Sequence, residues 1–438
     1  MTQPSSAFAA RGLVAVCAGL IASTLAPSTT VTTRAQEGAQ PSVQMIEAEG
    51  EAGRYWARWR GPSGQGVARG GPYPDSWSAL GPFAWKVAVP GRGNSSPIVW
   101  QDRIFLTTAY DGGRRLALLC FRRGDGRKLW ELPLDVQGVE YAHPKNGHAS
   151  GTPVTDGVRV YASFGEQGLI AASLDGTLLW RQRIGTLNAF HGSAGSPVLY
   201  KDRVILYHDG GAQSFVAAFD GATGKPVWRT PRRASEGWGT PIVLRAGSRD
   251  ELIVSGQDRV SGYDPNTGRE LWWVEGNTDQ VIPTPVVAHD LVLCSSGRAG
   301  PTLAIRPGGT GNVTSSRVAW SMSKGSPFVP SGIVSGDVLY LLNDMQSIVT
   351  ALEVTTGKLL FQGRLGASRS EGFSASPVAA DGKVFFTNDD GETFVVEAGR
   401  QFKLLRVNRL EEPVLASPAL VDGTWYVRTS SSLVAIGK

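Results

Sequence analysis

The sequence contains only three cysteines among its 438 residues. Cys17 lies in an apolar N-terminal stretch, so an exported and processed chain would keep only Cys120 and Cys294. These two lie far apart in the chain, in apolar strand-like segments, which favours small core residues over a disulfide pair. A C-x-x-C-H motif is absent, which excludes covalent haem attachment and a fused cytochrome.

Recognisable catalytic signatures are also missing. The sequence shows no H-E-x-x-H motif and no identifiable Ser–His–Asp arrangement. The stretch FDGATGKPVW, residues 219–228, has a Gly and a Lys in the order that a phosphate-binding loop uses. However, Phe219 stands where that loop needs its first Gly, and Pro226, which has no N–H and no hydroxyl, follows the Lys. The stretch is therefore not a nucleotide-binding loop.

The sequence has no large excess of charge of either sign. The chain has 43 basic and 38 acidic residues, a formal net charge of +5, and no long basic run, so we predict no nucleic-acid partner. At the N-terminus, Arg11 precedes GLVAVCAGLIASTLA, which is too short to span a bilayer and is typical of an export signal. Residues 1–35 are the predicted signal peptide, with cleavage near Ala26 or Ala35. We expect a periplasmic or extracellular protein without a transmembrane segment after cleavage.

Glycine, proline and tryptophan are plentiful: 55, 26 and 13 residues, as expected for many short strands joined by tight turns. The stretch ending at Trp228 recurs 44 residues later as YDPNTGRELW, and weaker copies are FRRGDGRKLW, ASLDGTLLW and LEVTTGKLLF. A second signature runs in phase with it, as in SSPIV, GTPVT and GSPVL. Its Pro, or a Gly, recurs at positions 97, 153, 197, 241, 285, 332, 377 and 418.

Eight units that begin 41–56 residues apart, with a pattern of four short strands, predict an all-β, eight-bladed β-propeller of four-stranded antiparallel blades. The last unit has room for three strands only, while Trp85 lies 12 residues before Pro97, the spacing of a fourth strand. We therefore expect the N-terminal strand to pair into the last blade and close the ring. The predicted parts are an arm over residues 36–80 and a propeller over 81–438. Six tryptophans are expected to pack between neighbouring blades and are called wedges below; they are Trp85, Trp130, Trp180, Trp228, Trp272 and Trp320.

The pattern A-x-D-x-x-T-G-K-x-x-W, best matched from Ala218 to Trp228, resembles the repeat of the pyrroloquinoline-quinone (PQQ) propeller family over residues 81–438. The resemblance implies the fold. It leaves the function open, because the family includes quinoprotein dehydrogenases and also a non-enzymatic lipoprotein of the outer-membrane β-barrel assembly machinery. The dehydrogenases hold PQQ against a disulfide of adjacent cysteines and bind Ca²⁺ through acidic and amide side chains. This sequence lacks the adjacent cysteines, and no cofactor is predicted, although PQQ and Ca²⁺ stay open.

Function in propellers concentrates in the loops at the mouths of the central channel. The loop between Trp130 and Pro153 is long and carries His143 and His148, and the next loop carries His191. A metal or acid–base site there competes with ordinary loop hydrogen bonding, which we favour. The predicted ligand site at the channel mouth comprises Asn146, His148, His191, Glu236, Trp238, Asn277, Arg369 and Glu371.

The sequence favours an exported, non-catalytic binding or scaffolding propeller whose protein or small-molecule partner lies at the channel-mouth loops. The first alternative is a PQQ-dependent oxidoreductase with an atypical pocket near His148, His191, Glu236 and Trp238. A second alternative is a polysaccharide-binding propeller, which would need aromatic side chains exposed at one mouth.

Overall fold

The computed structural model describes residues 43–48, 50–234, 236–298, 300–366 and 372–437. The predicted signal peptide lies outside these residues, as do two predicted site residues, Arg369 and Glu371. All described residues belong to one compact unit, Pro41–Lys438. Among them no helix is long and apolar enough to cross a membrane.

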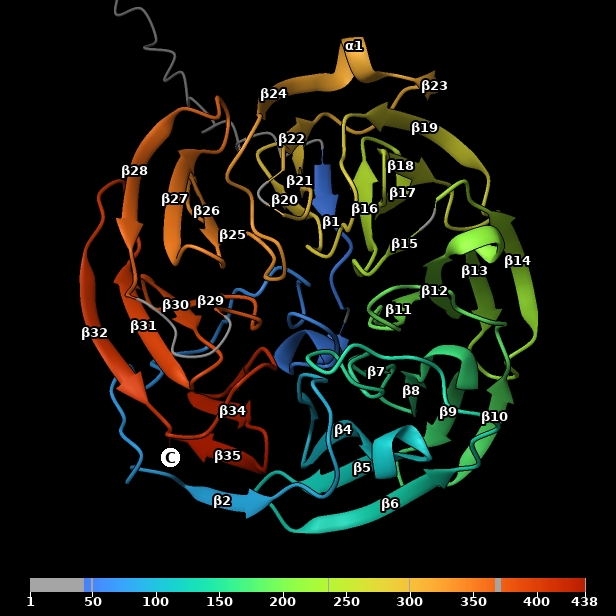
Figure 1. Ribbon diagram of the computed structural model, residues 1–438, viewed down its shortest axis with the longest axis vertical. Coiled ribbons are helices and arrows are strands. Elements are labelled where there is room, and N and C mark those ends of the chain that lie inside the picture. The colour runs from blue at the N-terminus through green and yellow to red at the C-terminus, as the bar shows by residue number, and fades with distance from the viewer. Residues whose placement is uncertain (1–42, 49, 235, 299, 367–371, 438) are drawn as a thin grey trace, which may run out of the picture. The chain divides into compact units, whose positions relative to one another are not determined.

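Eight antiparallel sheets of four main strands surround a central channel (Figure 1), which confirms the predicted eight-bladed propeller. In each blade the first strand lies at the channel and the last forms the outer edge. Blades 1 to 4 consist of β3 Ile98–Trp100, β4 Arg103–Tyr110, β5 Arg115–Arg122 and β6 Lys128–Leu134; β7 Val154–Thr155, β8 Arg159–Ser163, β9 Leu169–Ser173 and β10 Leu178–Gln182; β11 Val198–Tyr200, β12 Arg203–Gly210, β13 Phe215–Asp220 and β14 Pro226–Pro231; and β16 Ile242–Ala246, β17 Arg249–Ser255, β18 Arg259–Tyr263 and β19 Glu270–Glu275.

Blades 5 to 8 follow the same order. They consist of β20 Val286–Ala288, β21 Leu291–Ser295, β22 Thr302–Ile305 and β24 Val318–Met322; β25 Ile333–Ser335, β26 Val338–Asn343, β27 Ile348–Glu353 and β28 Leu359–Arg364; β29 Val378–Ala380, β30 Lys383–Thr387, β31 Glu392–Glu397 and β32 Leu404–Arg409; and β33 Ala419–Val421, β34 Thr424–Arg428, β35 Ser432–Ile436 and β2 Trp85–Ala88. The remaining elements are β1 Val43–Met45, β15 Glu236–Gly237, β23 Gly311–Asn312, the helix α1 Thr314–Arg317 and the 3₁₀ turns η1 Gly50–Arg54, η2 Asp111–Gly113, η3 Gly165–Gln167 and η4 Gly211–Gln213.

The core lies between the faces of neighbouring blades. Ala171 of blade 2, for example, shares one buried cluster with Val204 and Ala217 of blade 3. The three inner strands of each blade therefore read as nearly continuous apolar runs, because they are covered on both faces, whereas outer strands such as β14 are largely exposed. Burial of these faces, blade against blade, is what holds the ring together.

The ring is closed by the N-terminal strand, as predicted. β2 pairs antiparallel with β35 of blade 8, with Trp85 opposite Ala435 and Ala88 opposite Ser432. Lys86 of this strand forms an ion pair with Glu412 at 2.5 Å. Burial raises the pKa of Glu412, but Lys86 and hydroxyl donors outweigh it and bring the pKa down to about 2. The two ends of the propeller are thus joined by a strand ladder and by charge.

Five of the predicted wedges make the same contact with the following blade. The indole N–H groups of Trp85, Trp130, Trp180, Trp228 and Trp320 donate to backbone carbonyls of the next blade at 2.8–3.1 Å. Each ring also covers a glycine of that blade's outer turn. At Gly224, with φ +72°, an added Cβ would lie 2.6 Å from Trp180. The glycine in FDGATGKPVW is therefore a turn residue and a platform for the neighbouring tryptophan.

Trp272 differs from these five. It is buried, and its indole N–H donates to Glu251 Oε2 of its own blade at 2.8 Å. Gly262 opposite provides the space, because a Cβ there would lie 2.3 Å from the indole. In blade 5 an insertion carrying β23 and α1 replaces the tight outer turn, and β23 pairs parallel with β19. The tight turn that would have supplied a carbonyl acceptor for Trp272 is therefore missing, and β23 lies alongside β19 in its place.

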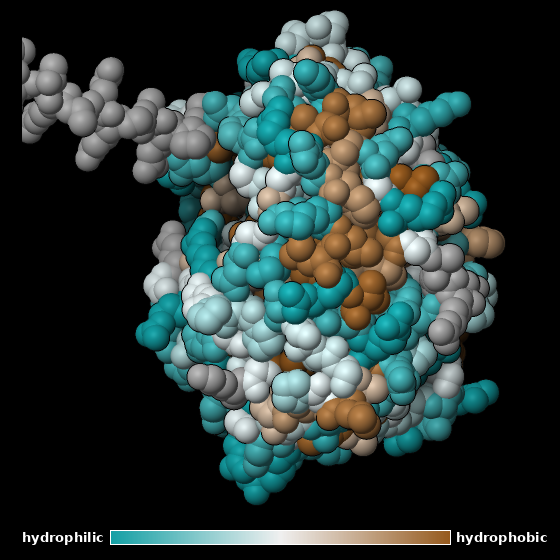
Figure 2. Space-filling view, turned by 90° about the vertical axis from the view of Figure 1, so that its left-hand side faces the viewer, coloured by the Kyte–Doolittle hydropathy of each residue, from teal (hydrophilic) through white to brown (hydrophobic). Residues whose placement is uncertain are grey.

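Blades 6 and 7 carry Phe361 and Arg406 at the wedge position. Phe361 contacts Phe402 of blade 7, with ring centroids 5.8 Å apart. Leu359 and Leu404 on the same outer strands are 53% and 38% exposed. Figure 2 shows this side of the unit, where an apolar area interrupts the hydrophilic surface.

The N-terminal arm crosses one end of the central channel (Figure 1). Residues 43–68 make backbone or side-chain hydrogen bonds to the innermost segments of six blades, through Val99, Thr155, Val243, Val287, Gly332 and Ala379. Beyond the channel, Tyr73 N donates to Asp381 at 2.6 Å and Trp425 donates to the Pro74 carbonyl at 3.0 Å. The arm therefore covers the inner strands and closes the channel at this end.

Candidate functional site: a blind cavity in the channel

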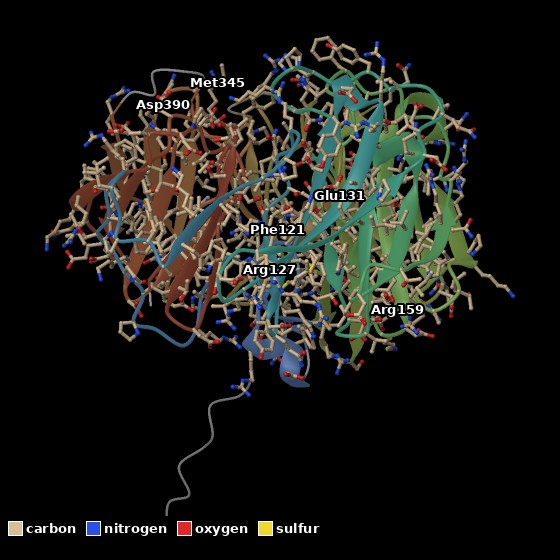
Figure 3. The ribbon with its side chains drawn as sticks, turned by 90° about the horizontal axis from the view of Figure 1, so that it is seen from below. Phe121, Arg127, Glu131, Arg159, Met345 and Asp390 are labelled. Carbon is tan, nitrogen blue, oxygen red and sulfur yellow. The ribbon has the colours of Figure 1, made fainter. Side chains whose placement is uncertain are left out.

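The channel contains a cavity of about 460 Å³, within the size range of small-molecule sites. Trp59 of the arm lies at its closed end. Its other end is surrounded by the loops that lead from each outer strand to the next inner strand. Figure 3 shows the two faces of the unit, with Met345 and Asp390 at one and Arg159 at the other. Met345 lines the cavity, so the cavity opens on the face that carries Met345.

The floor of the cavity is a ring of eight hydroxyl residues, one from each blade. Each stands directly before the Pro, or Gly332, of its repeat; they are Ser96, Thr152, Ser196, Thr240, Thr284, Ser331, Ser376 and Ser417. Backbone N–H groups donate to the hydroxyl oxygen of the following blade, at 2.8–3.3 Å, in six of these junctions. Trp59 Nε1 donates to Thr284 Oγ1 at 3.0 Å, which fixes the indole on this floor.

A second ring lies two residues earlier in each repeat. Its members also line the cavity; they are Asn94, Ser150, Ala194, Trp238, Ile282, Val329, Ser374 and Leu415. Blades 3 to 6 supply four apolar side chains in succession, from Ala194 to Val329. Blades 7, 1 and 2 supply Ser374, Asn94 and Ser150. The wall is therefore apolar on one side and largely polar on the other.

Aromatic side chains gather around His191 at the rim. The His191 ring lies 5.0 Å from Trp238, 5.2 Å from His143 and 6.3 Å from Phe328, measured between centroids. Trp238 donates its indole N–H to the Gly192 carbonyl at 2.7 Å, so its orientation is fixed. Burial, together with the neighbouring His143 and Arg298, lowers the pKa of His191. His191 is therefore neutral near pH 7 and can donate or accept a hydrogen bond.

Charged groups of both signs lie at the rim. Lys145, on the loop between blades 1 and 2, reaches across the mouth to Asp389 of blade 7, with Nζ 2.8 Å from Oδ2. Asp344 accepts a hydrogen bond from Phe328 N at 2.7 Å, and burial raises its pKa to about 6. The Arg298 guanidinium lies 5.0 Å from the centroid of Phe328. Among the described residues, two cations thus face two carboxylates at the rim, and their charges balance.

The structure brings three of the predicted site residues to the cavity: Asn146, His191 and Trp238. Asn146 holds the mouth loops together, because its Nδ2 donates to the carbonyls of His191 and Ser193 at 2.8 and 3.0 Å. His148, Glu236 and Asn277 are not among the described lining residues. His148 lies against Gly113, where an added Cβ would be 2.6 Å from its ring.

Glu236 and Asn277 have local partners instead. Glu236 accepts a hydrogen bond from Phe190 N at 3.0 Å, which joins two neighbouring loops. Asn277 is buried and donates to Ser255 Oγ and the Gly256 carbonyl at 3.1 and 2.9 Å. Both residues position loops, and of the predicted group His148, His191, Glu236 and Trp238 only His191 and Trp238 are among the described residues that line the cavity.

The sequence analysis missed the hydroxyl ring, although its signal was present. A Ser or Thr directly precedes the recurrent Pro, or Gly332, in all eight units, from Ser96 to Ser417. A weaker signal marks the carboxylates, because Asp209, Asp344 and Asp389 each lie 12 residues after the Pro or Gly of their unit. Nothing in the pattern indicates that two of them approach the cavity while the third is paired elsewhere. Lys145 and Trp59 carry no repeat signal at all.

The described residues that line the cavity do not match the donor set for PQQ and Ca²⁺. Ca²⁺ takes about six to eight oxygen ligands, whereas Asp344 is the one carboxylate among the described lining residues. In the part of the chain that the structure describes, no three His, Cys, Asp or Glu side chains form a group that could hold a metal ion. Cys120 and Cys294 are free and buried in β5 and β21, and burial raises the pKa of each to about 12.

We predict that Asp344→Asn stabilises the protein at pH 7.5 by up to about 3 kcal/mol and has little effect at pH 4. Burial raises the pKa of Asp344 to about 6 in the folded chain, above its usual value near 3.8. The folded chain therefore binds this proton more tightly than the unfolded chain, and stability is lost as the pH rises through 6. Thermal denaturation between pH 4 and 8 measures the effect. Asp279→Asn, at an exposed aspartate, is the control; a lower melting temperature of Asp344→Asn at pH 7.5 would contradict the prediction.

Comparison with known proteins identifies the family. The family model described as outer membrane protein assembly factor BamB matches residues 81–215 and 212–437. The chain belongs to this family. BamB of Burkholderia pseudomallei (strain K96243) is 23% identical over 290 residues, which cover 63% of this chain and 68% of that protein.

Two solved structures share the fold. BamB from Moraxella catarrhalis matches with a TM-score of 0.58 and 15% identity, covering 81% of this chain and 96% of that one. Quinohemoprotein alcohol dehydrogenase from Comamonas testosteroni matches with a TM-score of 0.62 and 12% identity, covering 88% and 81%. An assembly factor and an alcohol dehydrogenase are thus similar to this chain to about the same degree, and at these identities the likeness extends to the fold alone.

Proposed function

We propose that this chain is an exported, non-catalytic propeller that binds a protein partner through its channel-mouth face and takes part in outer-membrane protein assembly from the periplasm. Its family and the name of its curated relative support this role. The quinoprotein alternative has less support, because the sequence has no adjacent cysteines and the described residues that line the cavity include a single carboxylate, Asp344.

Exposed apolar side chains on the mouth loops carry the proposal. Val139, Tyr141, Phe190 and Met345 are 48%, 61%, 57% and 67% exposed. The first three come from the loops around His143 and His191, and Met345 lines the opening of the cavity. Large apolar side chains collected on one face of a protein are typical of a protein-binding surface.

The mouth loops are also held in place before any partner arrives. His143 N donates to the His191 carbonyl at 3.2 Å, and Phe190 N donates to Glu236. The Lys145–Asp389 ion pair fixes the loop between blades 1 and 2 from across the channel. A preorganised surface loses less conformational entropy on binding, which favours a recognition role for this face.

Photo-crosslinking in the host tests the proposal. A photoreactive amino acid at position 190 or 345 is expected to yield adducts with subunits of the outer-membrane assembly machinery, identified by mass spectrometry. The matched control is position 158, because Val158 is 65% exposed and precedes Arg159, which lies at the opposite face (Figure 3). Equal adducts from both faces, or no adduct with an assembly subunit from positions 190 and 345, would rule out the proposed docking face.

A further inference from the structure

The blind cavity contains polar atoms whose hydrogen bonding within the protein is incomplete. Ser96 Oγ, Ser374 Oγ and His191 Nε2 are buried and make no hydrogen bond of normal geometry to a described residue, although Asp389 and Gln280 interact with the side chains of Ser374 and His191. All three residues line the cavity, at its floor, wall and rim. Buried polar atoms are nearly always hydrogen-bonded, so three such atoms facing one space indicate that a polar ligand completes their bonding.

The hydroxyl ring offers further donors to the same space. In six junctions the oxygen accepts a backbone N–H from the preceding blade, as at Thr152 Oγ1 and Ser376 Oγ. A hydroxyl that accepts one bond still has its own hydrogen to donate and one lone pair to offer. A ligand that presents several groups able both to donate and to accept would match this floor best.

The wall adds an apolar requirement. Trp59 lies on the floor, and Ala194, Trp238 and Ile282 form part of the apolar side, opposite Ser374, Asn94 and Ser150. A purely polar molecule would leave the apolar side uncovered, and a flat hydrocarbon would leave the orphaned hydroxyls unpaired. The matching ligand has an apolar face and a hydroxyl-bearing edge.

The charges of the rim argue for a neutral ligand. Lys145 is paired with Asp389, and Arg298 and Asp344 have opposite sign. A strongly anionic or cationic molecule would enter without a matching excess of opposite charge. We infer that the cavity binds a neutral saccharide, a mono- or disaccharide unit whose C–H face packs on Trp59 or Trp238 and whose hydroxyls pair with Ser96, Ser374 and His191.

Titration calorimetry and tryptophan fluorescence of the full chain, against a panel of neutral sugars, test this inference. The panel is glucose, galactose, mannose, N-acetylglucosamine, maltose, cellobiose and lactose, and glucose 6-phosphate is the charged comparison. We expect at least one neutral sugar to bind, with a dissociation constant below about 10 mM, and the phosphate ester to bind more weakly than glucose. No binding by any neutral sugar, or tighter binding of the charged ester, would overturn the inference.

Matched variants locate the binding. Ser374→Ala removes one orphaned hydroxyl, keeps the backbone hydrogen bond from Ser374 N to Asp389, and is expected to weaken binding by about 3- to 10-fold. Ser261→Ala is the control, since Ser261 Oγ is also buried without a described partner but does not line the cavity. Ala194→Phe fills the apolar side and should abolish binding. Equal affinity in Ala194→Phe and the parent chain would place the sugar elsewhere and refute the site.

Discussion

Deletion of residues 81–90 leaves a chain that shows no cooperative thermal transition and elutes as an expanded or associated species. The deletion removes β2, the outermost strand of blade 8, and with it four residue pairs to β35. It also removes Trp85, which donates to the Arg123 carbonyl of blade 1 at 2.9 Å and covers Gly126. Blade 8 then exposes the unpaired edge of β35, and no tryptophan packs between blades 8 and 1. The contact between these two blades, which closes the ring, therefore loses this support.

Circular dichroism, calorimetry and size-exclusion chromatography measure this outcome. Trp85→Ala isolates the wedge and is expected to cost about 3 kcal/mol, because it deletes a large packed ring and its hydrogen bond. Trp273→Ala is the matched control: this half-buried indole lies on an outer strand, where the Arg259 guanidinium stands 5.2 Å above its ring. An unchanged melting temperature in the deleted chain would show that the ring does not depend on the N-terminal strand.

The fold could be predicted because each blade repeats the same local physics. A Pro-initiated inner strand, a glycine turn with positive φ and an outer tryptophan recur along the chain, and eight phased copies leave little choice of architecture. Trp272 does not follow this pattern, because its indole N–H donates to a residue of its own blade. The insertion before β24 removes the tight turn of blade 5, and Gly262 gives the indole room to turn toward Glu251.

The site was only partly predictable, because its members meet through the ring and not along the sequence. Of the residues predicted on the mouth loops, Asn146, His191 and Trp238 line the cavity, since these loops surround the channel. His148 is only two residues from Asn146, yet it turns toward Gly113, where the absence of a side chain makes space. The contact of Lys145 with Asp389 joins residues 244 positions apart and depends on the closed ring, so no local pattern reveals it.

Asp209 shows how one repeat position serves two purposes. In blades 6 and 7 the equivalent Asp344 and Asp389 approach the channel mouth, whereas in blade 3 Asp209 pairs with Arg232. The side chains of Asp209 and Arg232 are 0% and 3% exposed, and Nε lies 2.9 Å from Oδ1. Burial opposes the charge of Arg232, but Asp209 outweighs burial, and the net effect raises the pKa of the guanidinium.

Asp209→Ala is expected to destabilise the protein by about 3–5 kcal/mol, because it leaves a buried guanidinium without its carboxylate. Tyr263 would remain as a partner, through its hydroxyl at 2.5 Å from Nη1, but a phenol does not neutralise the charge. Urea denaturation at pH 7 measures the loss. The double variant Asp209→Leu/Arg232→Met removes both charges and should recover most of the stability, since an apolar pair of similar volume replaces the ion pair. If the single and double variants are equally unstable, the effect comes from packing around Tyr207 and Tyr263 and not from the uncompensated charge.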